Sequence, residues 1–299
     1  NGIIHTGMGG TGEGQLGRPQ TGDCDDDGNV YIADTLNAKV MVFDDNYQFV
    51  QEWPVSGITA LEVAGETLYT RELGEIVAYT LDGTERSRFG ERGRGFGAML
   101  EATGGLAADE GVVYVADSLN QAMKAFSVEG VLLWSQPSGA EATETVTPEA
   151  TESEVASATT EDVEGEPVDL PADAALDANG ALYVVDAFSF QILRLENETG
   201  EVLRVYGRDG QNDAEFMYPS GIDYDEGRDW FVVADTANNR VQVVRIEGSG
   251  GGLAQAAQRS LSNPYRVCLI PLLALLLILL LIALTRRRRR ADTPGGDAR

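Results

Sequence analysis

The sequence predicts an all-β protein, a β-propeller of four-stranded blades, and a repeated short segment is the main reason. Four apolar, β-like runs each end in an aspartate, at Asp34, Asp117, Asp186 and Asp235. A proline lies 15 or 16 residues before three of these aspartates, and asparagine or serine lies three residues after each of the four. Repetition with a period of about forty residues is typical of propeller blades.

Each copy of the repeat contains the strands and turns of a small antiparallel sheet. In the last copy, residues 221–224, 230–234 and 240–244 alternate in polarity or are rich in β-branched and aromatic side chains, which favours strands. Asp27-Gly28 and Asn179-Gly180 suit two-residue hairpins, which need positive φ. A fifth, less regular copy carries Thr70 in place of the aspartate. Five blades are therefore predicted.

The two ends of the repeat region predict how the ring closes. The last copy contains no fourth strand after Ile246, whereas residues 1–6 align with the fourth-strand segment that precedes Gly207. We therefore expect the N-terminal segment to complete the last blade.

The repeat resembles the NHL-repeat family of β-propellers over residues 1–134 and 169–246. The matching residues of the last copy are a Gly-rich approach at 207–216, Pro219, Asp235, Asn238 and Arg240. Those of the first copy are Gly7, Leu16, Pro19, Asp34, Asn37 and Lys39. The family norm implied by the resemblance is six blades, so we expect one further blade upstream of the present chain; a true five-bladed ring is the alternative. The resemblance implies no single function, because the family includes RNA binders, receptor sensor domains, scaffolds and lyases.

An acidic segment interrupts the predicted propeller of residues 1–246. Residues 135–168 contain nine acidic residues and no lysine or arginine. Such a composition cannot bury enough apolar surface to fold, so we expect a disordered insert. The insert is either a solvated spacer or a docking or O-glycosylated segment.

The C-terminus is expected to anchor the protein in the cell membrane. Residues 247–264 read as a linker, 265–285 as a transmembrane helix with 18 consecutive uncharged residues, and 286–299 as a short basic tail. Five arginines at 286–290 place the tail in the cytoplasm and the propeller outside. A cleaved wall-sorting signal is the alternative, but no Leu-Pro-x-Thr-Gly motif precedes the segment.

Composition narrows the classes of partner. The formal net charge of −26 repels nucleic acid, so we expect a protein or another extracellular ligand instead. Cys24 and Cys268 are the only cysteines, one in the propeller and one in the predicted helix. No intrachain disulfide is therefore expected.

Catalysis has little support in the sequence. His5 is the only histidine, so a three-histidine zinc site cannot form. We expect a binding, scaffold or sensor module, and the alternative is a hydrolase or lyase with a carboxylate-bound divalent metal in the propeller channel. Calcium is the one candidate cofactor, since Asp23, Asp25, Asp27 and Asp34 have calcium-loop spacing. An acidic hairpin turn explains the same residues without a metal.

Two further groups of residues carry predictions. The blade aspartates Asp34, Asp117, Asp186 and Asp235 are expected to be structural, because a carboxylate at a strand end accepts backbone N–H groups of the next turn. A basic cluster in an otherwise acidic chain is predicted to bind a partner; its members are Arg86, Arg88, Phe89, Arg92, Arg94 and Phe96. A loop that balances local charge is the alternative.

Overall fold

The computed structural model describes residues 8–94, 97–100, 104–109, 111–136 and 168–250. The chain divides into two units, residues 1–250 and residues 251–299, and the second lies outside the described residues. The predicted membrane helix and basic tail therefore lie there too. Among the residues described, no helix is long and apolar enough to cross a membrane.

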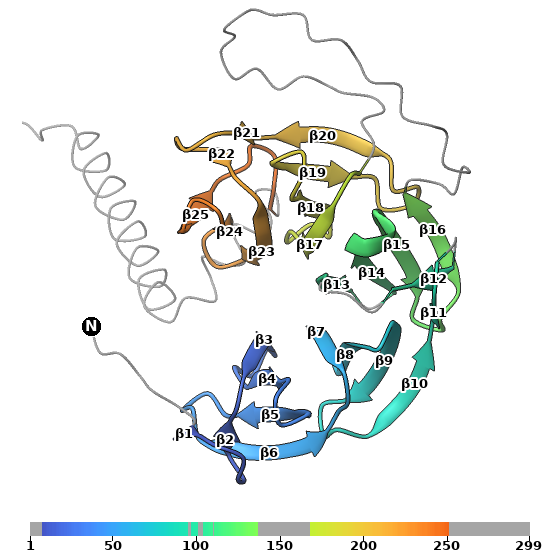
Figure 1. The fold of residues 1–299 in the computed structure, drawn as a ribbon, viewed down its shortest axis with the longest axis vertical. Coiled ribbons are helices and arrows are strands. Elements are labelled where there is room, and N and C mark those ends of the chain that lie inside the picture. Colours follow the sequence, from blue (N-terminus) through green and yellow to red (C-terminus); the bar gives the residue numbers. More distant parts are fainter. Residues whose placement is uncertain (1–7, 95–96, 101–103, 110, 137–167, 251–299) are drawn as a thin grey trace, which may run out of the picture. The chain divides into compact units, whose positions relative to one another are not determined.

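The first unit is a five-bladed β-propeller, which confirms the predicted all-β fold. Five antiparallel sheets follow one another around a common axis (Figure 1). Blade A contains β3 (Pro19–Cys24), β4 (Val30–Asp34), β5 (Lys39–Phe43) and β6 (Phe49–Pro54). Blade B contains β7 (Ile58–Ala64), β8 (Thr67–Glu72), β9 (Glu75–Thr80) and β10 (Glu85–Phe89).

The remaining three blades repeat this order. Blade C contains β13 (Leu106–Ala108), β14 (Val112–Asp117), β15 (Ala122–Ser127) and β16 (Leu132–Gln136), with a 3-10 turn, η1 (Ser118–Asn120), after β14. Blade D contains β17 (Pro171–Leu176), β18 (Leu182–Asp186), β19 (Gln191–Leu195) and β20 (Val202–Tyr206). Blade E contains β23 (Pro219–Asp225), β24 (Trp230–Asp235) and β25 (Arg240–Val244).

Short parallel strand pairs form in three of the Gly-rich connections that enter a blade. They are β1 (Met8–Gly9) with β2 (Gln15–Leu16), β11 (Glu91–Arg92) with β12 (Ala98–Met99), and β21 (Arg208–Asp209) with β22 (Glu215–Phe216). The recurrence of this pair before blades A, C and E shows that the repeat includes the connection as well as the sheet.

The core consists of four separate layers, one between each pair of successive blades. Side chains alternate along each strand, so every inner blade packs one face against the blade before it and the other against the blade after it. Between blades A and B, for example, Val40, Val42 and Trp53 contact Leu61 and Val77. Burial of this apolar surface, at about 25 cal/mol per Å², is the main force that holds the blades together.

Blade E differs from the others within the described residues, because it has three strands and one uncovered face. Val241 and Val243 of β25 are 65% and 56% exposed, whereas the corresponding Val40 and Val42 of blade A are buried. The predicted completion of this blade by residues 1–6 falls on residues 1–7, which are not described. The prediction of a sixth blade likewise stays a prediction.

The acidic insert is shorter than the sequence suggested. Ser135 and Gln136 belong to β16, where they pair with Lys124 and Met123, and Val168 is buried in the layer between blades C and D. The predicted bounds of 135–168 were therefore wrong at both ends, because Ser135 and Gln136 take part in strand pairing and Val168 packs in the core. Residues 137–167 lie outside the described part of the chain.

The four blade aspartates are buried and surrounded by donors. Asp34 accepts hydrogen bonds from the backbone N–H groups of Gly17 at 2.7 Å and Arg18 at 2.8 Å, and from the Asn37 side chain at 2.7 Å. Asp186 accepts the N–H groups of Asp169 and Leu170 in the same way. Each carboxylate thus ties the connection that enters a blade to the end of the blade's second strand.

In blade B this position belongs to Glu72, and the assignment of Thr70 from sequence was wrong by two residues. Glu72 pairs with Ile58 at the start of β7 and with Glu75 at the start of β9, as Asp34 pairs with Pro19 and Lys39 in blade A. The hairpin between β8 and β9 has two residues where the others have four, so the acidic residue shifts toward the third strand.

Asp117 holds a buried ionic network between blades B and C. Its carboxylate lies 3.1 Å from Arg71 Nη2 and 2.8 Å from Lys124 Nζ, and all three side chains are almost completely buried. Arg71 also donates to the carbonyls of Ala116 and Leu100, both at 2.8 Å. Arg71 lies beside Glu72 in β8. Blade B therefore supplies a cation to Asp117 of blade C.

We expect that removing the charge of Asp117, the single anion of this network, will lower the stability of the protein strongly. Asp117→Asn leaves two buried cations without a counter-charge, so we expect the free energy of unfolding to fall by about 3–5 kcal/mol. Urea unfolding of the purified protein measures this change. Glu75→Gln, which removes an exposed partner of Arg88, is the control and should cost less than about 1 kcal/mol. Equal effects of the two substitutions would contradict the assignment.

Candidate functional site

The innermost strands of the blades surround an axial cavity of about 430 Å³. Residues of β3, β7, β13, β17 and β23 line it. Six carboxylates belong to this lining; four of them lie on the inner strands of four different blades, namely Asp23, Glu62, Asp173 and Asp223, and Asp177 and Glu226 lie in the turns that follow β17 and β23. A cavity into which polar groups converge is a usual first candidate for a binding site. Its chemistry is that of an acidic channel.

Three of these carboxylates occupy one level of the channel. Each of Asp23, Glu62 and Asp223 pairs with a residue in the second strand of its own blade. In all three blades this partner lies three positions before the acidic residue that ends the second strand. Asp173 is paired with Val185, one position before Asp186, and therefore lies nearer that strand end. A Cβ atom on Gly105 would lie 1.4 Å from Asp173 Oδ1, so the glycine makes room for this carboxylate.

The channel carboxylates also join neighbouring blades. Asp23 Oδ2 accepts the N–H of Val63 at 2.7 Å, and Asp173 Oδ2 accepts the N–H of Ile222 at 3.0 Å. The other oxygen of each accepts the N–H of the following residue, Cys24 or Ala174. Both oxygens are thus used by inner-strand N–H groups that the sheets leave without a partner.

Burial and nearby negative charge raise the pKa values of Asp23, Glu62 and Asp173. Burial raises the pKa of Asp173 to about 7, and the negative charge of Asp223 acts in the same direction. Burial and the charges of Asp23, Asp173 and Asp223 raise the pKa of Glu62 well above its ordinary value. Burial also raises the pKa of Asp23. The channel therefore takes up protons near neutral pH more readily than free carboxylates would.

The predicted calcium ligands do not come together. Asp25 accepts hydrogen bonds from Asn29 and Tyr31 in the β3–β4 turn, and Asp23 points to Val63. Asp34 lies at the opposite end of β4, three residues or about 10 Å beyond Tyr31, whereas calcium ligands lie within about 2.6 Å of the ion. Across the described residues, no group of three or more His, Cys, Asp or Glu side chains is arranged to hold a metal ion.

The predicted basic cluster is largely committed to contacts within the protein. Arg88 forms ion pairs with Glu72, Glu75 and Glu85 at 3.2–3.4 Å. Phe89 is buried and packs on Phe126 with 5.9 Å between ring centroids, so it is a core residue and not a binding residue.

The other members of the cluster lie apart from this network. Arg86 donates to Thr67, Arg92 ends β11, and Arg94 lines a shallow hollow beside β12. Phe96 lies outside the described residues. Local charge balance thus explains Arg88, and partner binding by the other arginines stays a prediction.

One end of the propeller presents apolar side chains that the sequence reasoning missed. The hairpins between second and third strands carry Leu36, Leu73, Leu119 and Phe188 at their tips, and these residues are between 43% and 66% exposed. Tyr218, just before β23, lies at the same end, because β23 begins opposite the end of β24. We call this end the hairpin-tip face. Its signal in the sequence was an apolar residue two positions after Asp34, Asp117 and Asp186.

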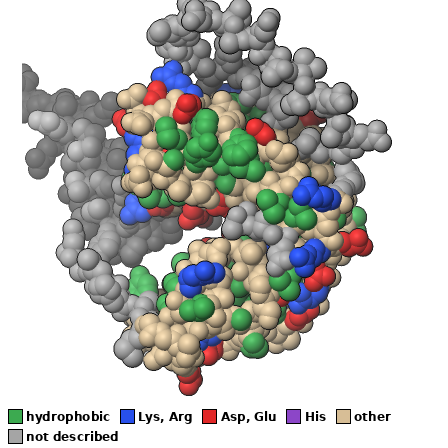
Figure 2. Space-filling model, viewed as in Figure 1, with side chains coloured by type: hydrophobic (Ala, Val, Ile, Leu, Met, Phe, Trp, Pro, Cys, Tyr) green, Lys and Arg blue, Asp and Glu red, His purple; other side chains and the backbone are tan. Residues whose placement is uncertain are grey.

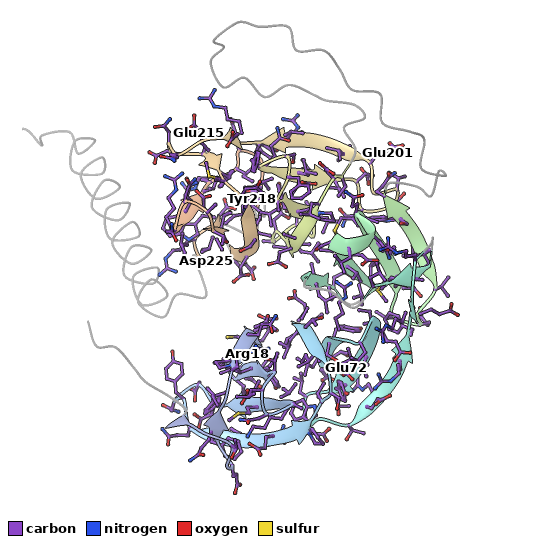
Figure 3. The ribbon with its side chains drawn as sticks, viewed as in Figure 1. Arg18, Glu72, Glu201, Glu215, Tyr218 and Asp225 are labelled. Atoms are coloured by element: carbon purple, nitrogen blue, oxygen red, sulfur yellow. The ribbon has the colours of Figure 1, made fainter. Side chains whose placement is uncertain are left out.

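Figure 2 shows hydrophobic side chains gathered on this face over blades D and E, in the region where Figure 3 labels Tyr218. Arg18, which precedes the first strand of blade A as Tyr218 precedes that of blade E, is visible on the same side. The face is thus open to a large partner, in contrast to the narrow axial cavity.

The raised pKa values predict that the propeller is more stable in mildly acidic solution. At pH 5.5 Asp173 is protonated when folded but ionised when unfolded, so folding binds a proton. This stabilisation is lost as the pH rises through about 7, and the loss amounts to roughly 2 kcal/mol between pH 5.5 and 7. Asp34 and Asp235, whose pKa values are lowered, stay ionised throughout this range.

Urea unfolding at several pH values tests this prediction. The free energy of unfolding of the wild-type protein should fall between pH 5.5 and 7.5, and the fall should be smaller in Asp173→Asn. Parallel pH profiles for the two proteins would show that Asp173 does not titrate in this range.

Comparisons with known proteins bear on the fold. No protein-family model matches the sequence, and no curated protein sequence matches it. An auxiliary nutrient binding protein from Bacteroides ovatus has a similar structure, with 16% identity and a TM-score of 0.53, over 78% of this chain and 60% of that one. Hydrazine synthase from Kuenenia stuttgartiensis has 12% identity and a TM-score of 0.51, over 82% and 81%.

Virginiamycin B lyase from Staphylococcus aureus also shows a likeness, with 15% identity and a TM-score of 0.46, over 76% of this chain and 69% of that one. Identities this low carry no information about activity or ligand. The likeness to the first two structures supports the β-propeller fold alone.

Proposed function

We propose that this protein is a membrane-anchored binding module, an NHL-type propeller held outside the cytoplasm by residues 265–285, which recognises a protein partner through its hairpin-tip face. The observation that carries the proposal is the repeated exposure of apolar side chains at one end of successive blades. Leu36, Leu119 and Phe188 occupy the second position of the four-residue hairpins of blades A, C and D, and Leu73 lies in the two-residue hairpin of blade B.

The repetition of exposed apolar side chains in successive blades is the reason to infer a binding face. Single exposed apolar residues are common on protein surfaces and need no explanation. Apolar side chains in the equivalent hairpins of four blades lie on a single face, and such a patch is typical of an interaction site. Short hairpins held by buried carboxylates also present these side chains on a rigid scaffold, which lowers the entropic cost of binding.

The alternative function, a metal-dependent hydrolase or lyase in the channel, has less support. Asp23 and Asp173 already direct both oxygens to backbone N–H groups. A divalent metal in the channel would have to compete with these hydrogen bonds, on which the contacts between blades depend. A binding function makes no such demand on the carboxylates.

Site-specific photo-crosslinking in cells that express the protein tests the binding face. With p-benzoylphenylalanine in place of Leu119 or Leu36, we expect discrete crosslinked products. The control position is Val131, which is 61% exposed in the β15–β16 turn at the opposite end. Products of equal yield at Val131, or products at that position alone, would contradict the proposal.

The proposed orientation is tested separately, by protease treatment. Protease added to intact cells should remove the propeller and leave a membrane-bound C-terminal fragment, because the arginine block at 286–290 is expected inside. Digestion that requires cell lysis would show that the orientation is reversed.

A further inference from the structure

Three aromatic side chains form an exposed cluster on the hairpin-tip face. Phe188 and Phe190 belong to the β18–β19 hairpin of blade D, and Tyr218 precedes β23 of blade E. The Tyr218 ring lies 5.1 Å from that of Phe190 and 6.2 Å from that of Phe188, with interplanar angles of 89° and 80°. Phe188 and Tyr218 are each about half exposed. This aromatic cluster bridges two blades.

Two members of the aromatic cluster hold an unfavourable backbone conformation. Phe190 has φ of 59° and Tyr218 has φ of 48°, and the left-handed region costs an ordinary L-residue about 1–2 kcal/mol. The same hairpin position also has positive φ at Ala38, Gln121 and Asn239, so the turn requires the left-handed conformation, which asparagine tolerates best. Phenylalanine at this position is therefore not required by the turn.

Tyr218 is unusual for a second reason. Arg18 and Leu170 occupy the corresponding position before the first proline of blades A and D, and neither has positive φ. Strain that the repeat does not require is typically retained where a side chain is held for recognition.

The aromatic cluster rests on a rigid base. Phe190 packs on the buried layer between blades D and E, in which Tyr183 and Phe231 stack with 4.5 Å between centroids. Such a support fixes the exposed rings before a partner arrives, so few rotamers are lost on binding. Aromatic residues in this setting are the usual hot spots of protein interfaces.

Acidic residues lie at the same end of the propeller as the aromatic cluster, since Asp169 donates its N–H to Asp186 and the connection that contains Gly210 accepts a hydrogen bond from Asn238. Asp169 precedes β17, and Asp209 and Asp213 lie in the connection that leads from β20 to β23; all three are exposed. The chain as a whole carries a formal net charge of −26. Such a field favours a partner with positive charge beside its apolar contact and disfavours anionic lipid or nucleic acid.

From these observations we propose that the aromatic cluster binds an apolar side chain of a protein segment that carries lysine or arginine on its flanks. The proposal rests on the proposed function, because it names the anchor and the partner chemistry of the hairpin-tip face. The three rings supply the apolar contact, and Asp169, Asp209 and Asp213 supply the opposite charge. The leucines at the other hairpin tips extend the contact.

Selection of random twelve-residue peptides displayed on phage, with the full chain in detergent as bait, tests the proposal. We expect enriched peptides to carry a Leu, Ile, Met or Phe residue between basic residues. A synthetic peptide of the enriched sequence should bind at least tenfold more weakly to Tyr218→Asn and to Phe188→Ser. Because asparagine tolerates positive φ, Tyr218→Asn should fold normally, which its melting temperature will show.

Tyr47→Asn is the matched control. Tyr47 is 40% exposed and has φ of 60°, but it lies in the β5–β6 turn at the opposite end. This substitution should leave peptide binding unchanged. Tyr218→Phe should also bind normally, since the contact uses the ring and not the hydroxyl.

The remaining outcomes separate the two proposals. If Leu36→Ser and Leu119→Ser weaken binding while Tyr218→Asn and Phe188→Ser do not, the aromatic cluster is not the anchor, although the hairpin-tip face still binds. Enriched peptides without an apolar residue or without positive charge would overturn the proposed partner chemistry. Binding that no substitution on this face affects, or the absence of any enriched peptide, would overturn both proposals.

Discussion

The buried carboxylate at the end of each second strand is the interaction on which the propeller depends. A charge withdrawn from water needs several donors, and at Asp34 these come from Gly17 and Arg18 in the entering connection and from Asn37 in the hairpin that follows. The carboxylate thereby fixes the start of the first strand against the end of the second. Glu72 occupies the corresponding place in blade B, where its carboxylate accepts hydrogen bonds from Thr70 and Tyr79.

The number of hydrogen-bond donors around each carboxylate also explains why the pKa values of Asp34 and Asp173 shift in opposite directions. Burial raises the pKa of Asp34, but hydrogen bonds from Arg18, Gly17 and Asn37 outweigh this effect, so its pKa lies below the ordinary value. Asp173 has two backbone donors and another carboxylate nearby, and its pKa rises to about 7. Ionised Asp34 therefore stabilises the fold at neutral pH, whereas Asp173 stabilises the fold more when it is protonated.

Local features of the repeat could be read from the sequence, and features that depend on spacing or on several blades could not. Strand alternation, glycine turns and the four aspartates are properties of short segments, and they predicted the blades correctly. Thr70 was assigned in place of Glu72 because a shorter hairpin moves the acidic residue while the rest of the blade stays aligned. The spacing of Asp23, Asp25, Asp27 and Asp34 along the sequence matches a calcium loop. In the structure, however, the extended strand β4 places Asp34 far from the turn that contains Asp25 and Asp27.

The site required the three-dimensional arrangement because its members are dispersed along the chain. Asp23, Glu62 and Asp223 meet only after inner strands of different blades surround one axis. Three of the hairpin-tip residues lie two positions after Asp34, Asp117 and Asp186, but a single leucine in a polar turn is also common surface variation. Backbone conformation adds the information that the sequence lacks. An aromatic side chain at the left-handed position of Phe190 opposes the local preference of the chain, and the fold retains it on the face that four blades present together.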